Sequence, residues 1–105
     1  MSEFLVSSWD RMGEKITADG RCTVGDLHVG DTFIALCRLV FEPPPETYSK
    51  PPVRTSVGEI RYRITGIIAY EQSLDSIEEG MTARLVLEVQ KGFEYVAKGD
   101  ALATE

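Results

Sequence analysis

Residues 53–70 read VRTSVGEIRYRITGIIAY, and this stretch decides the fold class. Its apolar and basic side chains alternate along the chain, with Ile60, Tyr62 and Ile64 on one side and Arg61 and Arg63 on the other. A period of two is typical of a β-strand that buries one face and exposes the other. The stretch therefore predicts a long strand whose apolar face belongs to the core.

Most of the remaining chain also favours strands. Met81–Val89 alternates in the same way, with Leu85 and Leu87 expected inside and Arg84 outside. Shorter strands are predicted at 4–6, 16–24, 32–41 and 101–103. The chain holds 9 glycines, and frequent turns between short strands are typical of sandwiches and closed barrels. The sequence therefore predicts an all-β fold.

Gln72–Glu79 is the segment for which the sequence favours a turn of helix. Leu74 and Ile77 lie three residues apart, so a helical turn would bring them onto one side. No long stripe of helical spacing occurs elsewhere in the chain. We therefore expect strands, rather than helices, to supply the core.

The composition is that of one small globular domain, residues 1–105, with 43% hydrophobic residues. No apolar run is long enough to span a membrane, and the first residues do not resemble a signal peptide, so we expect a cytoplasmic protein. The net charge is −6 and is spread evenly over both halves of the chain. A nucleic-acid binder usually has a basic face, so this charge disfavours direct binding of RNA.

Residues 42–52 hold all 5 prolines of the chain and are expected to form an exposed loop between strands. Tyr48 lies in this loop between Glu46 and Lys50. A stiff loop loses little entropy on docking, and tyrosine is enriched at interfaces, so these three residues are candidate protein contacts. The alternative is that the Tyr48 ring folds back over an open end of the barrel.

Gly25–Thr32 has the glycine spacing of a phosphate-binding loop but lacks its lysine. Asp31 stands at the lysine position, where a carboxylate would repel phosphate, so we expect no GTP binding. His28 is the only histidine, and with Cys22 and Cys37 it lacks the spacing of a metal site. We therefore predict a turn at His28, reduced cysteines with Cys37 in the core, no cofactor and no catalytic activity.

Three arginines are the candidate anion or RNA contacts. Arg61 and Arg63 share the outward face of one predicted strand, and Arg84 lies on the outward face of another. Arginines spaced in this way can hold a phosphate or a carboxylate group. They can equally pair with acidic side chains of a neighbouring strand, which would keep the sheet face soluble.

Three motifs occur in order along the chain: GRCTVGDLHVGDT at 20–32, ITGIIAY followed by LD and EG at 64–80, and KGDALA at 98–103. In this order and spacing they resemble the second domain of elongation factor Tu and related translational GTPases. The resemblance covers most of the chain and implies a six- or seven-stranded Greek-key closed β-barrel. It does not imply GTP hydrolysis, because the nucleotide site of those factors lies in a separate domain.

From these observations we expect a stand-alone, non-catalytic β-barrel that engages another macromolecule, most simply a protein. It would act as a mimic of the translation-factor domain, or as an inhibitor or immunity-type protein. The alternative is a translation- or RNA-associated accessory module. In that case basic side chains, with Arg61, Arg63 and Arg84 among them, would converge on one face.

Overall fold

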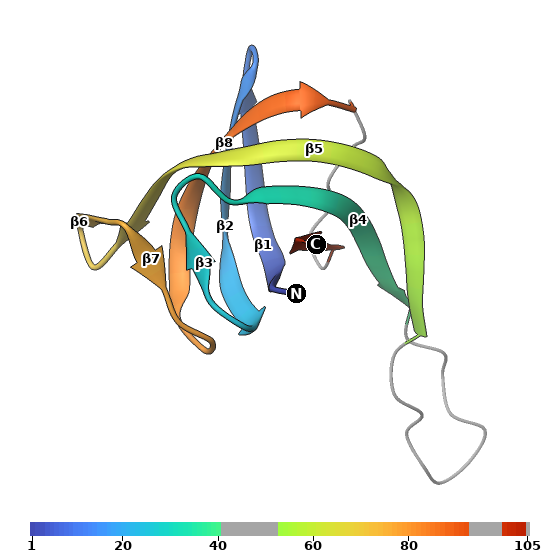
Figure 1. Cartoon of the computed structure of the whole chain (residues 1–105), viewed down its shortest axis with the longest axis horizontal. Coiled ribbons are helices and arrows are strands. Elements are labelled where there is room, and N and C mark those ends of the chain that lie inside the picture. The colour runs from blue at the N-terminus through green and yellow to red at the C-terminus, as the bar shows by residue number, and fades with distance from the viewer. Residues whose placement is uncertain (41–52, 93–99, 105) are drawn as a thin grey trace, which may run out of the picture.

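The computed structural model describes residues 1–40, 53–92 and 100–104. The strands are β1 (Glu3–Met12), β2 (Lys15–Val24), β3 (Leu27–His28), β4 (Thr32–Val40), β5 (Val53–Ala69), β6 (Gln72–Leu74), β7 (Ser76–Ile77), β8 (Thr82–Lys91) and β9 (Asp100–Thr104). Within these ranges there is no helix, and so none that is long and apolar enough to cross a membrane. The predicted all-β character is confirmed (Figure 1).

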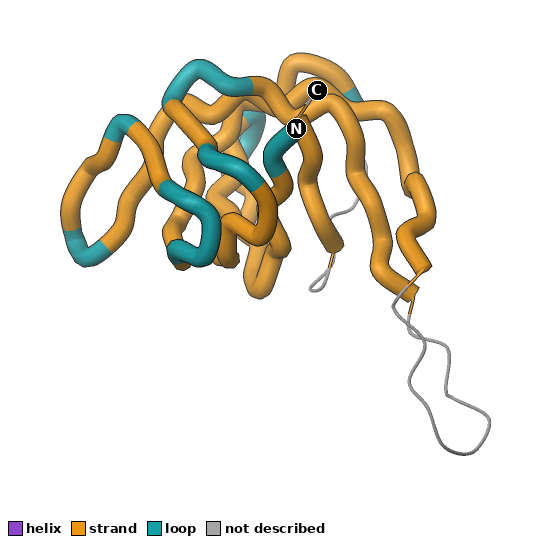
Figure 2. The backbone as a smooth tube through the Cα atoms, turned by 60° about the horizontal axis from the view of Figure 1, so that its bottom comes forward, coloured by secondary structure: helices purple, strands orange, loops and turns teal. Residues whose placement is uncertain are grey.

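Six strands close into a barrel in the order β4-β9-β1-β2-β8-β5, and the pairing of β5 with β4 completes the ring. Neighbours in this ring are antiparallel, and Figure 2 shows how the strands curve around a shared interior. The long strand β5 serves two neighbours, because it pairs with β4 along its first part and with β8 along its second. The closed barrel predicted from the sequence is therefore confirmed.

The barrel interior is filled by the alternate residues of each strand. Fully buried side chains include Phe4, Ile16, Phe33, Leu36, Ile60, Tyr62, Ile64, Leu85 and Leu87. The half-buried Trp9 packs at the edge of this core, with its ring centroid 6.3 Å from that of Tyr62. Cys22 and Cys37 are buried and form no disulfide. The predicted inward faces of β5 and β8 are thus confirmed.

The predicted turn of helix at Gln72–Glu79 is wrong. β6 folds back on the end of β5, and β7 pairs with β3 as a two-stranded ribbon. Ile77 is buried in this ribbon opposite Leu27. An isolated turn of helix gains little stability on its own, so these tertiary partners outweigh the spacing of Leu74 and Ile77.

β9 closes the barrel between β4 and β1 and brings a buried carboxylate with it. Asp100 is 1% exposed and accepts hydrogen bonds from Nε and Nη2 of Arg38 on β4, at 3.0 and 3.2 Å. Paired hydrogen bonds of this kind offset the cost of removing a charge from water. The ion pair therefore stabilises the packing of β9 against β4.

Candidate functional site

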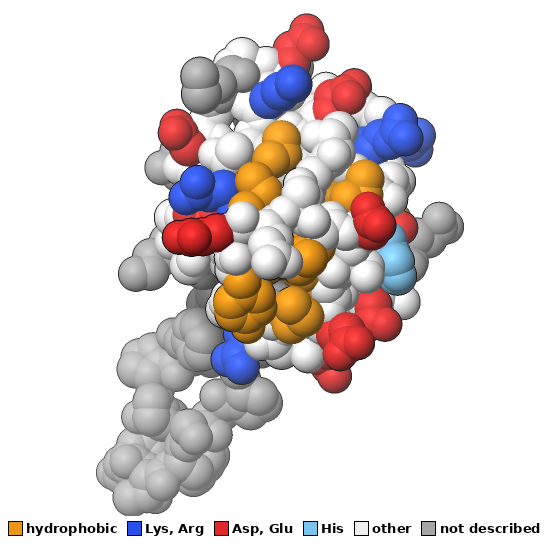
Figure 3. All heavy atoms as spheres, turned by 90° about the vertical axis from the view of Figure 1, so that its left-hand side faces the viewer, with side chains coloured by type: hydrophobic (Ala, Val, Ile, Leu, Met, Phe, Trp, Pro, Cys, Tyr) orange, Lys and Arg blue, Asp and Glu red, His pale blue; other side chains and the backbone are white. Residues whose placement is uncertain are grey.

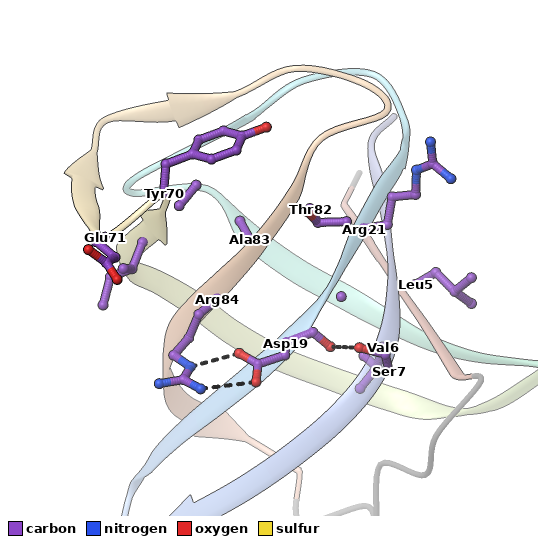
Figure 4. A pocket seen from close by; sticks show the side chains of 13 residues that line it. Leu5, Val6, Ser7, Asp19, Arg21, Tyr70, Glu71, Thr82, Ala83 and Arg84 are labelled. Atoms are coloured by element: carbon purple, nitrogen blue, oxygen red, sulfur yellow. Dashed lines mark hydrogen bonds and ion pairs between the residues drawn. The ribbon is translucent and has the colours of Figure 1, made fainter.

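A hollow of about 650 Å³ lies on the outer face of the barrel (Figure 4). Its lining comes from residues 5–7 of β1, 19–21 of β2, 82–84 of β8 and 68–71 at the end of β5. We call this hollow the outer groove. In the space-filling view of Figure 3, which shows the β6 and β7 side of the molecule, apolar side chains lie near the middle and charged ones surround them. The groove is thus assembled from four neighbouring strands that are distant in sequence.

The strand register decides which outward side chains are neighbours in the groove. Two rungs of side chains cross it: Leu5, Arg21 and Thr82 form the first rung, and Asp19, Arg84 and Ile68 form the second. Paired strands lie about 4.8 Å apart, so side chains on neighbouring strands of one rung are within reach of each other. Each rung combines an apolar side chain with a charged one. The groove therefore offers hydrophobic surface and charge together.

Two small residues lie between the rungs. Gly20 of β2 and Ala83 of β8 lie opposite each other, and both are buried. A Cβ atom at Gly20 would collide with the carbonyl oxygen of Leu5, so a glycine is needed where β1 crosses β2 this closely. Because both residues belong to the inward-facing set of their strands, the groove meets their backbone at this point. This leaves room between the outward side chains of the two rungs.

Asp19 and Arg84 form an ion pair across the second rung (Figure 4). Nε and Nη2 of Arg84 donate to the two carboxylate oxygens at 2.7 and 3.1 Å, and Ser8 Oγ donates at 3.0 Å. The hydrogen bond from Arg84 lowers the pKa of Asp19, and the same hydrogen bond raises the pKa of Arg84. Both groups are therefore charged at neutral pH and compensate each other.

Tyr70 and Glu71 form the two-residue connection between β5 and β6 at the edge of the groove. Both have positive φ, 53° and 61°, like the central residues of a type I′ hairpin turn. That turn favours Asn-Gly, and other L-residues cost about 1–2 kcal/mol each in this conformation. Tyr70 is nevertheless 79% exposed, and Ile68 is 39% exposed. Unfavourable backbone angles thus hold an aromatic ring in water beside the groove, which stability alone would not favour.

Arg21 and Glu71 carry opposite charges on two sides of the groove. Nε of Arg21 donates to the carbonyl oxygen of Gly80 at 3.1 Å, and no carboxylate of the described residues lies within ion-pair distance of Arg21. Glu71 is exposed and forms no ion pair with any residue that the structure describes. Figure 4 shows Arg21 beside Leu5 on one side and Tyr70 above Glu71 on the other. Both charges are therefore available to a ligand.

The three arginines predicted as anion contacts do not share a site. Arg84 lies in the outer groove, where its charge is compensated. Arg61 and Arg63 lie at an earlier part of β5, opposite Lys91 and Glu88 of β8. Glu88 and Arg84 are four positions apart on β8, which is about 13 Å along a strand. Arg84 therefore lies apart from Arg61 and Arg63, and the convergence of basic side chains on one face stays a prediction.

The predicted protein contacts lie outside the described residues: Tyr48, Lys50 and Glu46, with the loop at 42–52. Gly25–Thr32, the segment that resembles a phosphate-binding loop, is described. It contains β3 and a turn in which Asp31 Oδ2 accepts a hydrogen bond from the N–H of His28 at 2.8 Å. The next element is the strand β4, so Asp31 supports a turn where a phosphate-binding loop would present its lysine ahead of a helix.

The main residues of the outer groove do not follow from the predicted motifs, although the sequence holds a signal for some of them. Ile67 and Ile68 are adjacent, so strict alternation forces one of the two outward. Tyr70-Glu71 stands where a tight hairpin would favour Asn-Gly. Arg21 has no such signal, since its place in the groove depends on the pairing of β2 with β8.

No protein-family model matches the chain, and no curated protein matches it.

Proposed function

We propose that the protein is a non-catalytic binding module that holds part of another protein in its outer groove. The observation that carries this proposal is Tyr70, which is 79% exposed on a turn with unfavourable backbone angles. Backbone strain of this kind tends to occur where a side chain is presented for function. Tyrosine is also one of the residues that contribute most often to the energetic centres of protein interfaces.

The surroundings of Tyr70 suit a protein ligand. Ile68 and Leu5 extend the apolar surface, and Arg21 and Glu71 lie at its margins. An apolar centre with a polar rim is the usual organisation of a protein interface. The lining also belongs to paired strands and a tight hairpin, so little conformational entropy is lost on binding.

RNA is less well supported as the ligand. The net charge is −6, and Arg84, the basic side chain of the second rung, is already paired with Asp19. Contacts to phosphate depend on uncompensated positive charge and weaken steeply with salt. Binding of RNA with a steep salt dependence would therefore speak against the proposal.

The proposal covers two kinds of partner. The resemblance to the second domain of translational GTPases favours a mimic that binds a component which those factors also bind. A small acidic barrel equally suits an inhibitor or immunity-type protein, by analogy alone. If a purified translational GTPase displaced the captured partner in a competition experiment, that result would favour the mimic.

Affinity capture from the native host tests the proposal when it is paired with a variant of the groove. Tyr70→Asn removes the ring at a position whose positive φ is well tolerated by asparagine, so the fold should be retained. Ile34→Thr is the matched control. Ile34 is an exposed apolar side chain on β4, a strand that pairs with neither β2 nor β8.

We expect one protein to be captured by the wild type and by Ile34→Thr but not by Tyr70→Asn. With the purified partner, Tyr70→Asn should lose at least about 1 kcal/mol of binding free energy. Equal capture by all three proteins would show that the outer groove is not the binding surface.

A further inference from the structure

We propose that the outer groove recognises an extended segment of its protein partner in which an acidic, an apolar and a basic residue occupy alternate positions. The acidic residue would meet Arg21, the apolar side chain would enter the hollow beside Tyr70, and the basic residue would meet Glu71. This proposal rests on the proposed function, because it specifies the ligand of the same groove.

Charge complementarity selects the outer two residues of the segment. Four ionised side chains line the groove, and two of them, Asp19 and Arg84, compensate each other through hydrogen bonds at 2.7 and 3.1 Å. The charges that remain are Arg21, which donates to a carbonyl oxygen, and Glu71, which is exposed. A ligand of one sign would be attracted at one side and repelled at the other. A segment with an acid at one end and a base at the other is attracted at both.

The spacing of the two charges follows from the strand order. β8 lies between β2, which carries Arg21, and the end of β5, from which Tyr70 and Glu71 follow as a turn. Arg21 and the end of β5 are therefore two strand spacings apart, about 10 Å. Glu71 is the second residue of the turn that follows. In an extended peptide, positions i and i+4 lie on one side of the chain and are about 13 Å apart, so they span this distance.

The middle residue of the bound segment should be apolar, because the side chains around the middle of the groove are apolar. Leu5, Ile68 and Tyr70 surround the hollow, and the small residues Gly20 and Ala83 lie between the rungs. Position i+2 of an extended peptide falls on the same side as i and i+4, so its side chain points into this hollow. A helix, about 10 Å wide, would rest on the Tyr70 and Arg21 side chains and leave the space between the rungs unfilled.

The test is a selection from a displayed library of random nonapeptides. The wild type is compared with Arg21→Glu, which reverses one of the two free charges. Lys91→Glu is the control, because it makes the same change of charge at an exposed ion pair elsewhere, where Lys91 Nζ lies 3.5 Å from a carboxylate oxygen of Glu59. The two variants change the net charge by the same amount, and Trp9 fluorescence together with the melting temperature shows that each protein is folded.

We expect the wild type and the control variant to select peptides in which an acid and a base flank an apolar residue at alternate positions, in either order. Arg21→Glu should select base-x-apolar-x-base. A peptide selected by the wild type should bind Arg21→Glu at least about tenfold more weakly, because like charges then face each other in either direction of the peptide.

Two outcomes would overturn the inference and leave the proposed function standing. The first is that all three proteins select the same peptides, with binding that still requires Tyr70. The second is that the selected acid and base are seven positions apart, as on one face of a helix. If no selected peptide loses affinity for Tyr70→Asn, the proposed function fails together with this inference.

Discussion

The inner and outer sides of β2 and β8 share one backbone but differ in what holds their side chains in place. On the inner side, Ile16, Ala18, Leu85 and Leu87 lie opposite one another and are 1% exposed or less. The alternate pairs point to the outer side, where Asp19 meets Arg84 and Arg21 meets Thr82 in contact with water. Burial of apolar surface stabilises the inner set, whereas the outer set is placed by the register that the inner set imposes.

Two arginine–aspartate pairs among the residues that the structure describes illustrate the same difference. Arg38–Asp100 and Arg84–Asp19 each have two hydrogen bonds between guanidinium and carboxylate. The Asp100 side chain is 2% exposed, whereas that of Asp19 is 38% exposed. The two pairs therefore share a hydrogen-bond geometry but differ in exposure. Arg38–Asp100 is buried at its carboxylate, and Arg84–Asp19 lies on an accessible surface. The predictions below test this contrast in order of expected effect.

Leu85→Ala and Ile64→Ala remove large side chains from the inner side. Each should lower the free energy of unfolding by about 2–5 kcal/mol, because both side chains are fully buried and their removal leaves a cavity. Urea denaturation followed by Trp9 fluorescence measures the change. Val86→Ala, on the outward side next to Leu85, is the control and should cost less than about 1.5 kcal/mol. Losses of similar size for all three variants would contradict the contrast between the two sides.

Asp100→Asn and Asp19→Asn remove the carboxylate charge from the two ion pairs. We expect Asp100→Asn to lower the free energy of unfolding by about 1–3 kcal/mol, because a buried acceptor loses its charge and Arg38 loses its partner. Asp19→Asn should cost at most about 1 kcal/mol, since both partners contact water. If Asp19→Asn lost more free energy of unfolding than Asp100→Asn, the Asp19–Arg84 pair would be important for the stability of the fold, which would contradict this contrast.

Replacing Tyr70-Glu71 with Asn-Gly should stabilise the protein and weaken binding. Both new residues suit the positive φ angles, so the free energy of unfolding should rise by about 1 kcal/mol. Partner binding should fall, because the exposed ring is gone. Thermal melting and an affinity measurement on one preparation give both quantities. A double variant that is less stable than the wild type would show that the Tyr70 side chain contributes to packing.

Acid should weaken the outer ion pair by a small amount. Arg84 lowers the pKa of Asp19 below its usual value of 3.8 in the folded state, so the pair stabilises the fold above this pH. This contribution is lost as the pH falls through the folded pKa, where the carboxylate becomes protonated. Between about pH 6 and pH 3 the wild type should therefore lose more stability than Asp19→Asn. Parallel pH profiles for the two proteins would contradict this assignment.

The alternation of apolar and polar residues predicted the strands well where a strand buries one face. The alternation at 60–64 and 83–87 identified the inward side chains of β5 and β8, because exposure of an apolar side chain is costly at any such position. It failed at Gln72–Glu79, where two short strands replace the expected turn of helix. Ile77 is buried there opposite Leu27, which lies fifty residues earlier in the chain. The residues around Ile77 alone cannot predict a partner that is so distant in sequence.

The candidate site was less accessible to prediction than the fold. Arg84 was identified as an outward basic side chain, but its pairing with Asp19 across 65 residues was not. Tyr48 was the expected aromatic contact and lies outside the described residues, whereas the exposed ring that the structure places beside the groove is Tyr70. An outward side chain has no hydrophobic constraint of its own, so its neighbours are unknown until the strand order is known.

The sequence by itself determined that this chain is all-β and which sides of β5 and β8 are buried, because a period of two in polarity is a local property. Only the tertiary structure decided that the ring closes through β4 and β5 and that β2 lies between β1 and β8. That order brings Leu5, Arg21 and Tyr70 to one groove from three separate parts of the chain. The physical reason is that strands pair through backbone N–H and C=O groups, which are nearly the same in every sequence. Which strands become partners is therefore decided by how the whole core packs.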